Sequence, residues 1–274
     1  AGVGAVFQAG LAAQARDLAV SPAVLSAPHP RPALRRPGAR APAFAMGVDG
    51  CPGGWVGVFA DMNGIEPPGH RVFSDFQAVL DFGAQIIAVD MPIGLPDAPS
   101  PAGMRACEAE ARALLGPRRS SVFPTPLRPA LTAESYEAAN AANRAAGGKG
   151  LSKQVFNIMG KIAEIDALMT PEREAFVFET HPETTIAAIT GAPAVHAKKT
   201  ADGRAERLAL LTGEGFDETL FQPHQYARKI AAPDDVIDAG LCCLTALRIA
   251  DGAALRLPGD PPRDGRGLRM AIFA

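Results

Sequence analysis

The chain has 274 residues and a mass of 28.4 kDa, with 47% hydrophobic residues, 20% charged residues and a formal net charge of −2. This composition excludes a disordered chain, and the sequence has no run of about 18 uncharged apolar residues that could cross a membrane as a helix. Glycine and proline show no repeat period, which excludes collagen and solenoid folds, and the charge is not that of a strongly basic coat protein of nucleic acid.

Residues 1–45 differ from the rest of the chain. They hold five arginines against a single acidic residue, Asp17, so their net charge is +4 and residues 46–274 carry −6. Frequent prolines interrupt any regular structure after the first turns. We therefore expect a poorly ordered basic leader, which is either a transit-like peptide or a tail preceding a start at Met46.

Residues 46–90 predict the first part of a sheet. The apolar runs 46–49 and 55–60 flank a glycine-rich segment, as in a β-hairpin. A third strand is expected at 70–74, followed by a helix over 75–84 that Ser74 can cap. The unbroken apolar run at 85–90 is typical of a central strand covered on both faces.

The remainder is mainly helical. Helices are predicted over 102–115, 132–146 and 151–169, then a strand at 175–179, helices at 183–190 and 203–213, and a long helix from 234 to about 250 that ends at Gly252. Residues 268–273 predict a short edge strand. This order indicates an α/β fold: one domain over 46–274, a mixed sheet with helices on both faces, and a helical insertion at about 101–170 before the last core strand.

The four cysteines lack zinc-finger spacing, and we expect reduced, mostly buried thiols. They are Cys51, Cys107, Cys242 and Cys243.

Acidic residues occur where the chain geometry can bring them together. Asp49 and Asp90 end two predicted strands, and ligands gather at strand ends beside a change in strand order. Asp235 and Asp238 are three residues apart on the last helix and share one side of it. An acidic pair in a first turn can also simply complement the helix N-terminus, although Asp234 alone could do that.

On the same helix, Cys242 and Thr245 continue the acidic face with small side chains. The apolar stripe expected to pack on the sheet consists of Val236, Ile237, Leu241 and Leu244.

Four carboxylates near one point repel one another strongly unless a cation lies among them. Oxygen-rich sites of this kind select Mg²⁺ or Mn²⁺. Two such ions about 4 Å apart can activate water and stabilise the leaving oxygen of a phosphodiester. The combination of acids therefore predicts a two-metal hydrolytic site.

Five segments in order along the chain resemble motifs of the domain-of-unknown-function 429 family, described as predicted RNase H-like nucleases. They are 47–55 (GVDGCPGGW), 89–96 (VDMPIGLP), 122–126 (VFPTP), 179–183 (ETHPE) and 234–239 (DDVIDA). The resemblance covers about 46–274 and implies an RNase H-like fold with an acid on the first strand, an acid ending the fourth strand, and acids on the last helix. Asp90 takes the fourth-strand role, and the Asp235–Asp238 pair is similar to the acidic helix of Holliday-junction resolvases.

Two further residues are candidates near this site. Glu179 ends the strand at 175–179, and His181 follows it by two residues, so both could share a face if the strand continued. We assign Glu179 to the catalytic set and His181 to substrate contact, where either could complete the metal site or position water. The alternative is a turn, because Pro182 breaks the strand.

Basic and polar side chains are candidates for contacts to the substrate backbone. Arg118 and Arg119 form a donor cluster in a loop, and guanidinium groups suit phosphate. Lys153, Asn157 and Lys161 form a polar row on the helix 151–169, which could instead be a solvated face. A second, weaker basic patch contains Lys198, Lys199, Arg204 and Arg207.

The leading hypothesis is a metal-dependent nuclease or phosphodiesterase of the cytoplasm. It would use Mg²⁺ or Mn²⁺ on Asp49, Asp90, Asp235 and Asp238, would have nucleic acid as its partner, and would make no membrane contact. One alternative is a small-molecule kinase or ATPase of the actin-like branch, since the glycine turn after Asp49 resembles a phosphate-binding hairpin in outline. The other is a non-catalytic nucleic-acid or protein binding module. DNA against RNA and the oligomeric state remain open.

Overall fold

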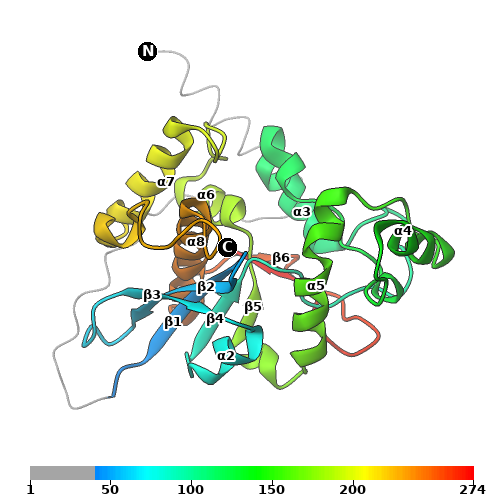
Figure 1. Cartoon of the computed structure of the whole chain (residues 1–274), viewed down its shortest axis with the longest axis horizontal. Coiled ribbons are helices and arrows are strands. Elements are labelled where there is room, and N and C mark those ends of the chain that lie inside the picture. Colours follow the sequence, from blue (N-terminus) through cyan, green and yellow to red (C-terminus); the bar gives the residue numbers. More distant parts are fainter. Residues whose placement is uncertain (1–40) are drawn as a thin grey trace.

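The computed structural model describes residues 41–274, so the leader prediction for residues 1–40 lies outside the described part. Five strands form a mixed sheet in the order β3-β2-β1-β4-β5 (Figure 1). The first three pair antiparallel, whereas β4 pairs parallel with β1 and β5 pairs parallel with β4. The strands are β1 (Phe44–Cys51), β2 (Gly54–Asp61), β3 (Gly69–Phe73), β4 (Ile86–Val89) and β5 (Val177–Glu179). The predicted hairpin and central strand are confirmed.

The hairpin turn between β1 and β2 requires glycine at position 54. Gly54 has φ +125°, and a Cβ there would lie 2.2 Å from the carbonyl oxygen of Phe73 on β3. A side chain at this position would therefore prevent β3 from pairing beside β2. The glycine-rich segment that marked the turn in the sequence is thus needed for the sheet as well as for the turn.

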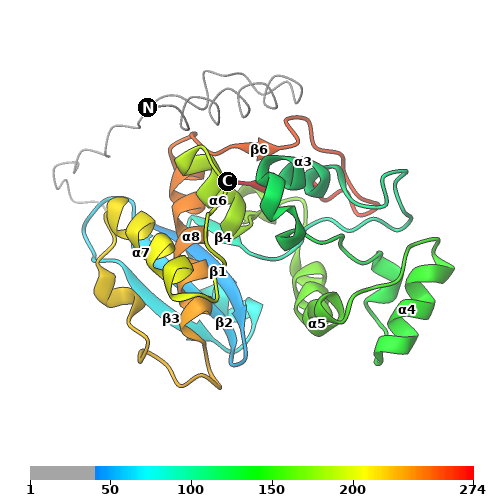
Figure 2. The ribbon, with the colours of Figure 1, turned by 90° about the horizontal axis from the view of Figure 1, so that it is seen from above.

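One face of the sheet packs against α2 (Phe76–Asp81) and α5 (Lys153–Leu168). Trp55 is fully buried in this layer, where its ring lies 5.1 Å from that of Phe76 and its indole N–H donates to Glu164 at 3.1 Å. The other face is covered by α8 (Pro233–Ala250), with α6 (Pro182–Thr190) and α7 (Ala201–Gly213) beside it (Figures 1 and 2). Helices on both faces are as predicted.

The predicted helical insertion is present between β4 and β5. It contains α3 (Ala106–Leu115), α4 (Tyr136–Ala145) and α5, with the short 3₁₀ helices η2 (Gly116–Ser121), η3 (Arg128–Ala130) and η4 (Arg173–Ala175). Both views show α4 far from the sheet, on the outer side of α5 (Figures 1 and 2). The short helix η5 (Glu218–Phe221) follows α7.

Two local predictions are wrong. Asp75, not Ser74, caps α2, because the Asp75 carboxylate accepts from the Ala78 N–H at 2.8 Å while Ser74 donates its hydroxyl to Asp75. The strand predicted at 268–273 shrinks to β7 (Ile272–Phe273), which pairs with β6 (Arg256–Leu257) in a separate small sheet. Between residues 41 and 274, no helix combines the length and apolar character needed to cross a bilayer.

Candidate active site

Strand alternation directs Asp49 and Asp90 to the same face of the sheet. On β1, Met46 and Val48 are buried with α2 and α5, so Asp49 belongs to the opposite, α8 side. On β4, Val89 likewise belongs to the α5 side, so Asp90 faces α8. The N–H of Asp90 donates to the carbonyl of Val48 at 2.9 Å, which continues the parallel ladder and places the two aspartates at neighbouring positions.

The last helix approaches β1 very closely. A Cβ at Gly47 would lie 1.9 Å from the backbone nitrogen of Cys243 and 2.2 Å from the carbonyl oxygen of Ala239. Only glycine permits this contact, and it brings the first turns of α8 beside the ends of β1 and β4. Asp238 is 3% exposed and Asp235 is half-buried, so both acids of the helix lie in the contact region.

The apolar stripe predicted on α8 is buried with residues of the sheet, and small residues of the same helix make an additional, closer contact with β1. Small residues, led by Ala239 and Cys243, make the closest approach. The predicted stripe is buried in a larger cluster that joins the sheet to α7 and η5. Its members are Val236, Ile237, Leu241 and Leu244. A small-residue face allows a shorter distance between helix and sheet than a leucine face would, and the aspartates depend on that distance.

The carboxylates are close enough to perturb one another. Burial, and then the charges of Asp90 and Asp238, raise the pKa of Asp49 well above its usual value. Burial raises the pKa of Asp90 and of Asp238 too, with Asp238 adding to the shift at Asp90. Burial also raises the pKa of Asp235, and the charges of Asp234 and Asp238 add to that shift. Burial is thus the largest cause of all four shifts, and the neighbouring carboxylates add to it at Asp49, Asp90 and Asp235.

Lys198 is the cation of this cluster, and the sequence placed it only in a weak basic patch. Its Nζ lies 2.8 Å from the Oδ2 of Asp238, and the charges of Asp238, Asp49 and Asp90 raise its pKa although burial opposes them. Lys198 belongs to the loop between α6 and α7, where neither periodicity nor a motif indicated its position. Its side chain is 45% exposed, so it reaches the cluster from the solvent side.

His181, a candidate for substrate contact in the sequence, also lies beside the cluster. It caps α6, with Nδ1 accepting from the Glu183 N–H at 3.2 Å and Nε2 lying 3.3 Å from the carbonyl oxygen of Ser121. The imidazole lies close enough to Asp90 and Asp238 to oppose the rise in the pKa of both carboxyl groups. Glu183 lies in the same region and forms a buried ion pair with Arg207, another partner that the sequence did not identify.

Glu179 is not brought into the cluster. It pairs in register with Val89, and paired residues of neighbouring strands point to the same face of the sheet. The Glu179 side chain therefore lies on the α5 face, opposite to Asp90. Both of its oxygens bind the buried Arg105, at 2.6 and 2.8 Å, and one also accepts from the Ile93 N–H at 2.8 Å. Burial still raises the pKa of Glu179. Because β5 ends at Glu179, it does not continue to His181, and the shared strand face considered for these two residues does not form.

The predicted substrate-binding side chains are dispersed. Arg118 donates to the carbonyls of Ala194 at 3.0 Å and Val195 at 2.8 Å, so it holds the loop that leads to Lys198. Lys161 donates to the Gly54 carbonyl and lies 4.6 Å from the centre of the Trp55 ring, on the sheet face opposite to the aspartates. The remaining candidates are exposed: Arg119, Lys153 and Asn157.

Comparison with known families matches residues 47–263 to the DUF429 family, described as a protein family of unknown function. The chain belongs to the DUF429 family. No curated protein and no solved structure matches the chain. The four aspartates of the cluster all lie inside the DUF429 region, as do Lys198 and His181.

The donor chemistry of this DUF429 site suits a hard divalent ion, since four carboxylates offer only oxygen and excess negative charge. Among residues 41–274, however, no three acidic, histidine or cysteine side chains form a ready coordination shell. The Oδ2 of Asp238 is engaged by Lys198. Binding an ion would therefore require Asp238 to exchange this partner and neighbouring carboxylates to turn inward.

The four cysteines are free and buried, as predicted.

Proposed function

We propose that this DUF429 protein is a metal-dependent phosphodiesterase that cleaves nucleic acid on an RNase H-like fold. One observation carries the proposal: acids from β1, the end of β4 and α8 gather at one end of the sheet, where burial raises the pKa of Asp49, Asp90 and Asp238, and repulsion between the carboxylates adds to the shift at Asp49 and Asp90. Such a cluster is unfavourable by itself and becomes favourable when divalent cations join it. The strand order and the acids at the first strand, the fourth strand and the last helix support the fold assignment.

In this proposal Asp49 and Asp90 hold the ions from the sheet side, and Asp235 and Asp238 hold them from α8. Mg²⁺ or Mn²⁺ bound there would supply an activated water and a counter-charge for the leaving oxygen. Lys198, which pairs with Asp238 in the structure, would be free to contact a phosphate oxygen if ions took its place at Asp238. His181, fixed as the cap of α6, stands beside Asp90 and orients the phosphate edge of the site.

The test is hydrolysis of structured RNA, RNA–DNA hybrids, branched DNA and single strands with Mg²⁺ and with Mn²⁺. Asp49→Asn, Asp90→Asn and Asp238→Asn should each lower the rate by at least about 100-fold while the protein stays folded. Asp251→Asn, an exposed aspartate at the other end of α8, is the matched control and should leave the rate unchanged.

Other outcomes would replace the proposal. Full activity of Asp49→Asn would remove the carboxylate site from the mechanism. Binding of nucleic acid without cleavage in any metal would favour the non-catalytic module. Strong thermal stabilisation by ATP with Mg²⁺, absent with Mg²⁺ alone, would favour the actin-like kinase.

A further inference from the structure

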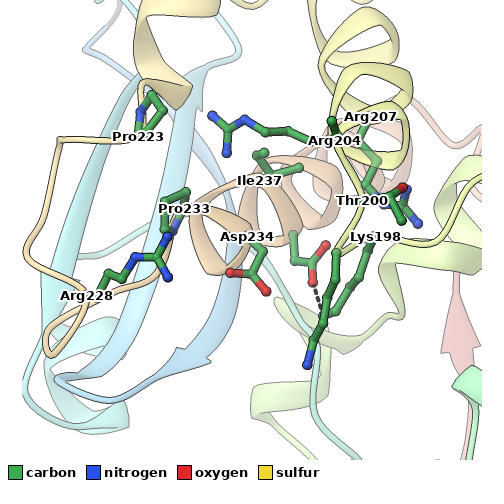
Figure 3. Close-up of a pocket in the computed structure, with 12 residues that line it drawn as sticks. Lys198, Thr200, Arg204, Arg207, Pro223, Arg228, Pro233, Asp234 and Ile237 are labelled. Carbon is green, nitrogen blue, oxygen red and sulfur yellow. Dashed lines mark hydrogen bonds and ion pairs between the residues drawn. The ribbon is translucent and has the colours of Figure 1, made fainter.

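A cavity of about 600 Å³ lies directly beside the aspartate cluster, between α7, the segment 222–232 and the start of α8. Its volume is within the range of about 300–1,000 Å³ that accommodates small ligands. Asp238, which belongs to the cluster, also lines the cavity, so the two spaces share a wall. Figure 3 shows the cavity and the Lys198–Asp238 ion pair at its edge.

The walls of this cavity are strongly basic. Five cationic residues line it against two acidic ones, Asp234 and Asp238. The cations are Lys198, Lys199, Arg204, Arg207 and Arg228. Figure 3 shows the side chains of Arg204 and Arg228 projecting into the space from opposite sides, one from α7 and one from the facing segment. An excess of positive charge in a recess predicts an anionic ligand.

Part of this charge has no ion-pair partner among the residues that the structure describes. Within residues 41–274, Lys198 pairs with Asp238 and the buried Arg207 pairs with Glu183. Lys199, Arg204 and Arg228 take part in no ion pair with the described residues, and Arg204 uses one nitrogen to donate to the Phe221 carbonyl at 2.6 Å. Guanidinium groups with unused N–H donors are suited to two-point contacts with phosphate oxygens.

We infer that this basic cavity binds a backbone phosphate of the nucleic-acid strand, next to the phosphate that the aspartate site cleaves. The inference rests on the proposed function. Lys199, Arg204 and Arg228 hold the phosphate, while Lys198 lies between the cavity and the carboxylates and sets the path of the strand from one to the other. The contacts are to phosphate alone, so the cavity fixes the position of the strand without selecting its sequence.

The test measures binding rather than cleavage. A short fluorescein-labelled single strand is titrated with protein in EDTA, by anisotropy, at salt concentrations from about 50 to 200 mM. Each lost phosphate contact lowers the slope of log K against log salt by about 0.7 on a single strand, so Lys199→Ala/Arg228→Ala should lower it by about 1.4. Both side chains are exposed, so the variant should fold normally.

The matched control is Arg144→Ala/Lys149→Ala, which removes two exposed positive charges at the α4 end of the insertion, far from the cavity. Its slope should equal that of the unmodified protein. Equal slopes for all three proteins, or equal losses in both variants, would overturn the inference. If the cavity variant lost affinity for a mononucleotide but not for the strand, the cavity would hold a free nucleotide, and the strand assignment would be wrong.

Failure of the proposed function is distinguishable from failure of this inference. Suppose that the salt dependence of binding becomes weaker in Lys199→Ala/Arg228→Ala but not in the control, and that the unmodified protein cleaves no substrate with any metal. The phosphate site is then supported and the nuclease proposal is ruled out. If the protein cleaves nucleic acid, but neither the cleavage rate nor the salt dependence of binding changes in either variant, the nuclease proposal is supported and the phosphate site is ruled out.

Discussion

Replacing Arg105 by methionine should destabilise the fold severely. The Arg105 side chain is 2% exposed and lies between two buried carboxylates, Glu108 at 2.8 Å and Glu179 at 2.6 Å. Its Nη1, which also donates to Glu179, donates to the carbonyls of Ile93 and Gly94, at 3.0 and 3.2 Å. Methionine fills similar space but leaves both carboxylates without a counter-charge, and breaking a buried pair from one side costs about 3–5 kcal/mol.

A domain of this size changes its melting temperature by about 2–4 °C for each kcal/mol, so Arg105→Met should melt about 6–20 °C lower. Urea unfolding measures the same loss as a free energy. Glu179→Gln keeps the shape and should cost only about 1–3 kcal/mol. The double variant, Arg105→Met/Glu179→Gln, should lose less free energy of unfolding than the sum of the two single variants, because Glu179→Gln removes one of the two carboxylates that Arg105→Met leaves without a counter-charge.

The same variants test the position of Glu179 outside the proposed metal site. If Mn²⁺ stabilises the unmodified protein thermally, as the proposal expects, the folded Glu179→Gln protein should keep that stabilisation, whereas Asp49→Asn should lose it. The reasoning is refuted if Arg105→Met costs under about 1 kcal/mol. It is also refuted if Glu179→Gln folds well and abolishes the response to Mn²⁺.

Three further changes test the geometry around the site. Gly47→Ala should lower the free energy of unfolding in urea by about 3 kcal/mol or more, because the added Cβ would meet the α8 backbone. Gly160→Ala, on an open helix surface, should raise it by up to about 1 kcal/mol. Equal effects of the two substitutions would contradict the close approach of α8 to β1. Burial alone would raise the pKa of Asp264, but hydrogen bonds from Arg128 and backbone N–H groups lower it. This carboxylate therefore stabilises the fold at neutral pH, and that stability is lost as the pH falls through its lowered pKa. Asp264→Asn should cost about 1–3 kcal/mol of unfolding free energy at pH 7 and progressively less in acid, and a cost that does not change with pH would contradict this account. Lys198→Met should lower the metal-free melting temperature and also lower the Mn²⁺ concentration that gives half-maximal stabilisation, since the competing cation is gone; a higher requirement would show that Lys198 assists the ion instead.

Strand alternation explains why the sequence could predict the aspartates of the sheet. Asp49 and Asp90 each follow an apolar run that reveals a strand, although Asp49 does not end its strand as predicted, because β1 continues to Cys51. The period of two then fixes the face, and the parallel register makes the two residues neighbours. The i, i+3 spacing of Asp235 and Asp238 similarly fixed their shared side of α8. Local rules thus located the acids, and packing of α8 on β1 brought them together.

Contacts that depend on irregular segments were beyond these rules. The loop that carries Lys198 has no periodicity, and its path depends on Arg118 binding two of its carbonyls from η2, far away in the sequence. Arg105 precedes α3 as an isolated basic residue, with nothing to indicate that it would neutralise Glu179. Hydrophobicity predicted the stripe of α8 that is buried with β2, but it gave no sign that Ala239 and Cys243 would make the closest contact, with Gly47 of β1.

The balance of charge around the aspartates shows why a metal site and a phosphate site would adjoin. One ammonium group, that of Lys198, faces several buried carboxylates, which therefore remain under-compensated even in the folded protein. The cavity beside them has the opposite imbalance, with cations in excess of acids. A cation in the first space and a phosphate in the second would relieve both excesses, and each would favour the other across the shared wall at Asp238. Nucleic-acid binding should accordingly tighten when Mn²⁺ is added to the unmodified protein but not when it is added to Asp49→Asn, and equal tightening in both would separate the two sites energetically.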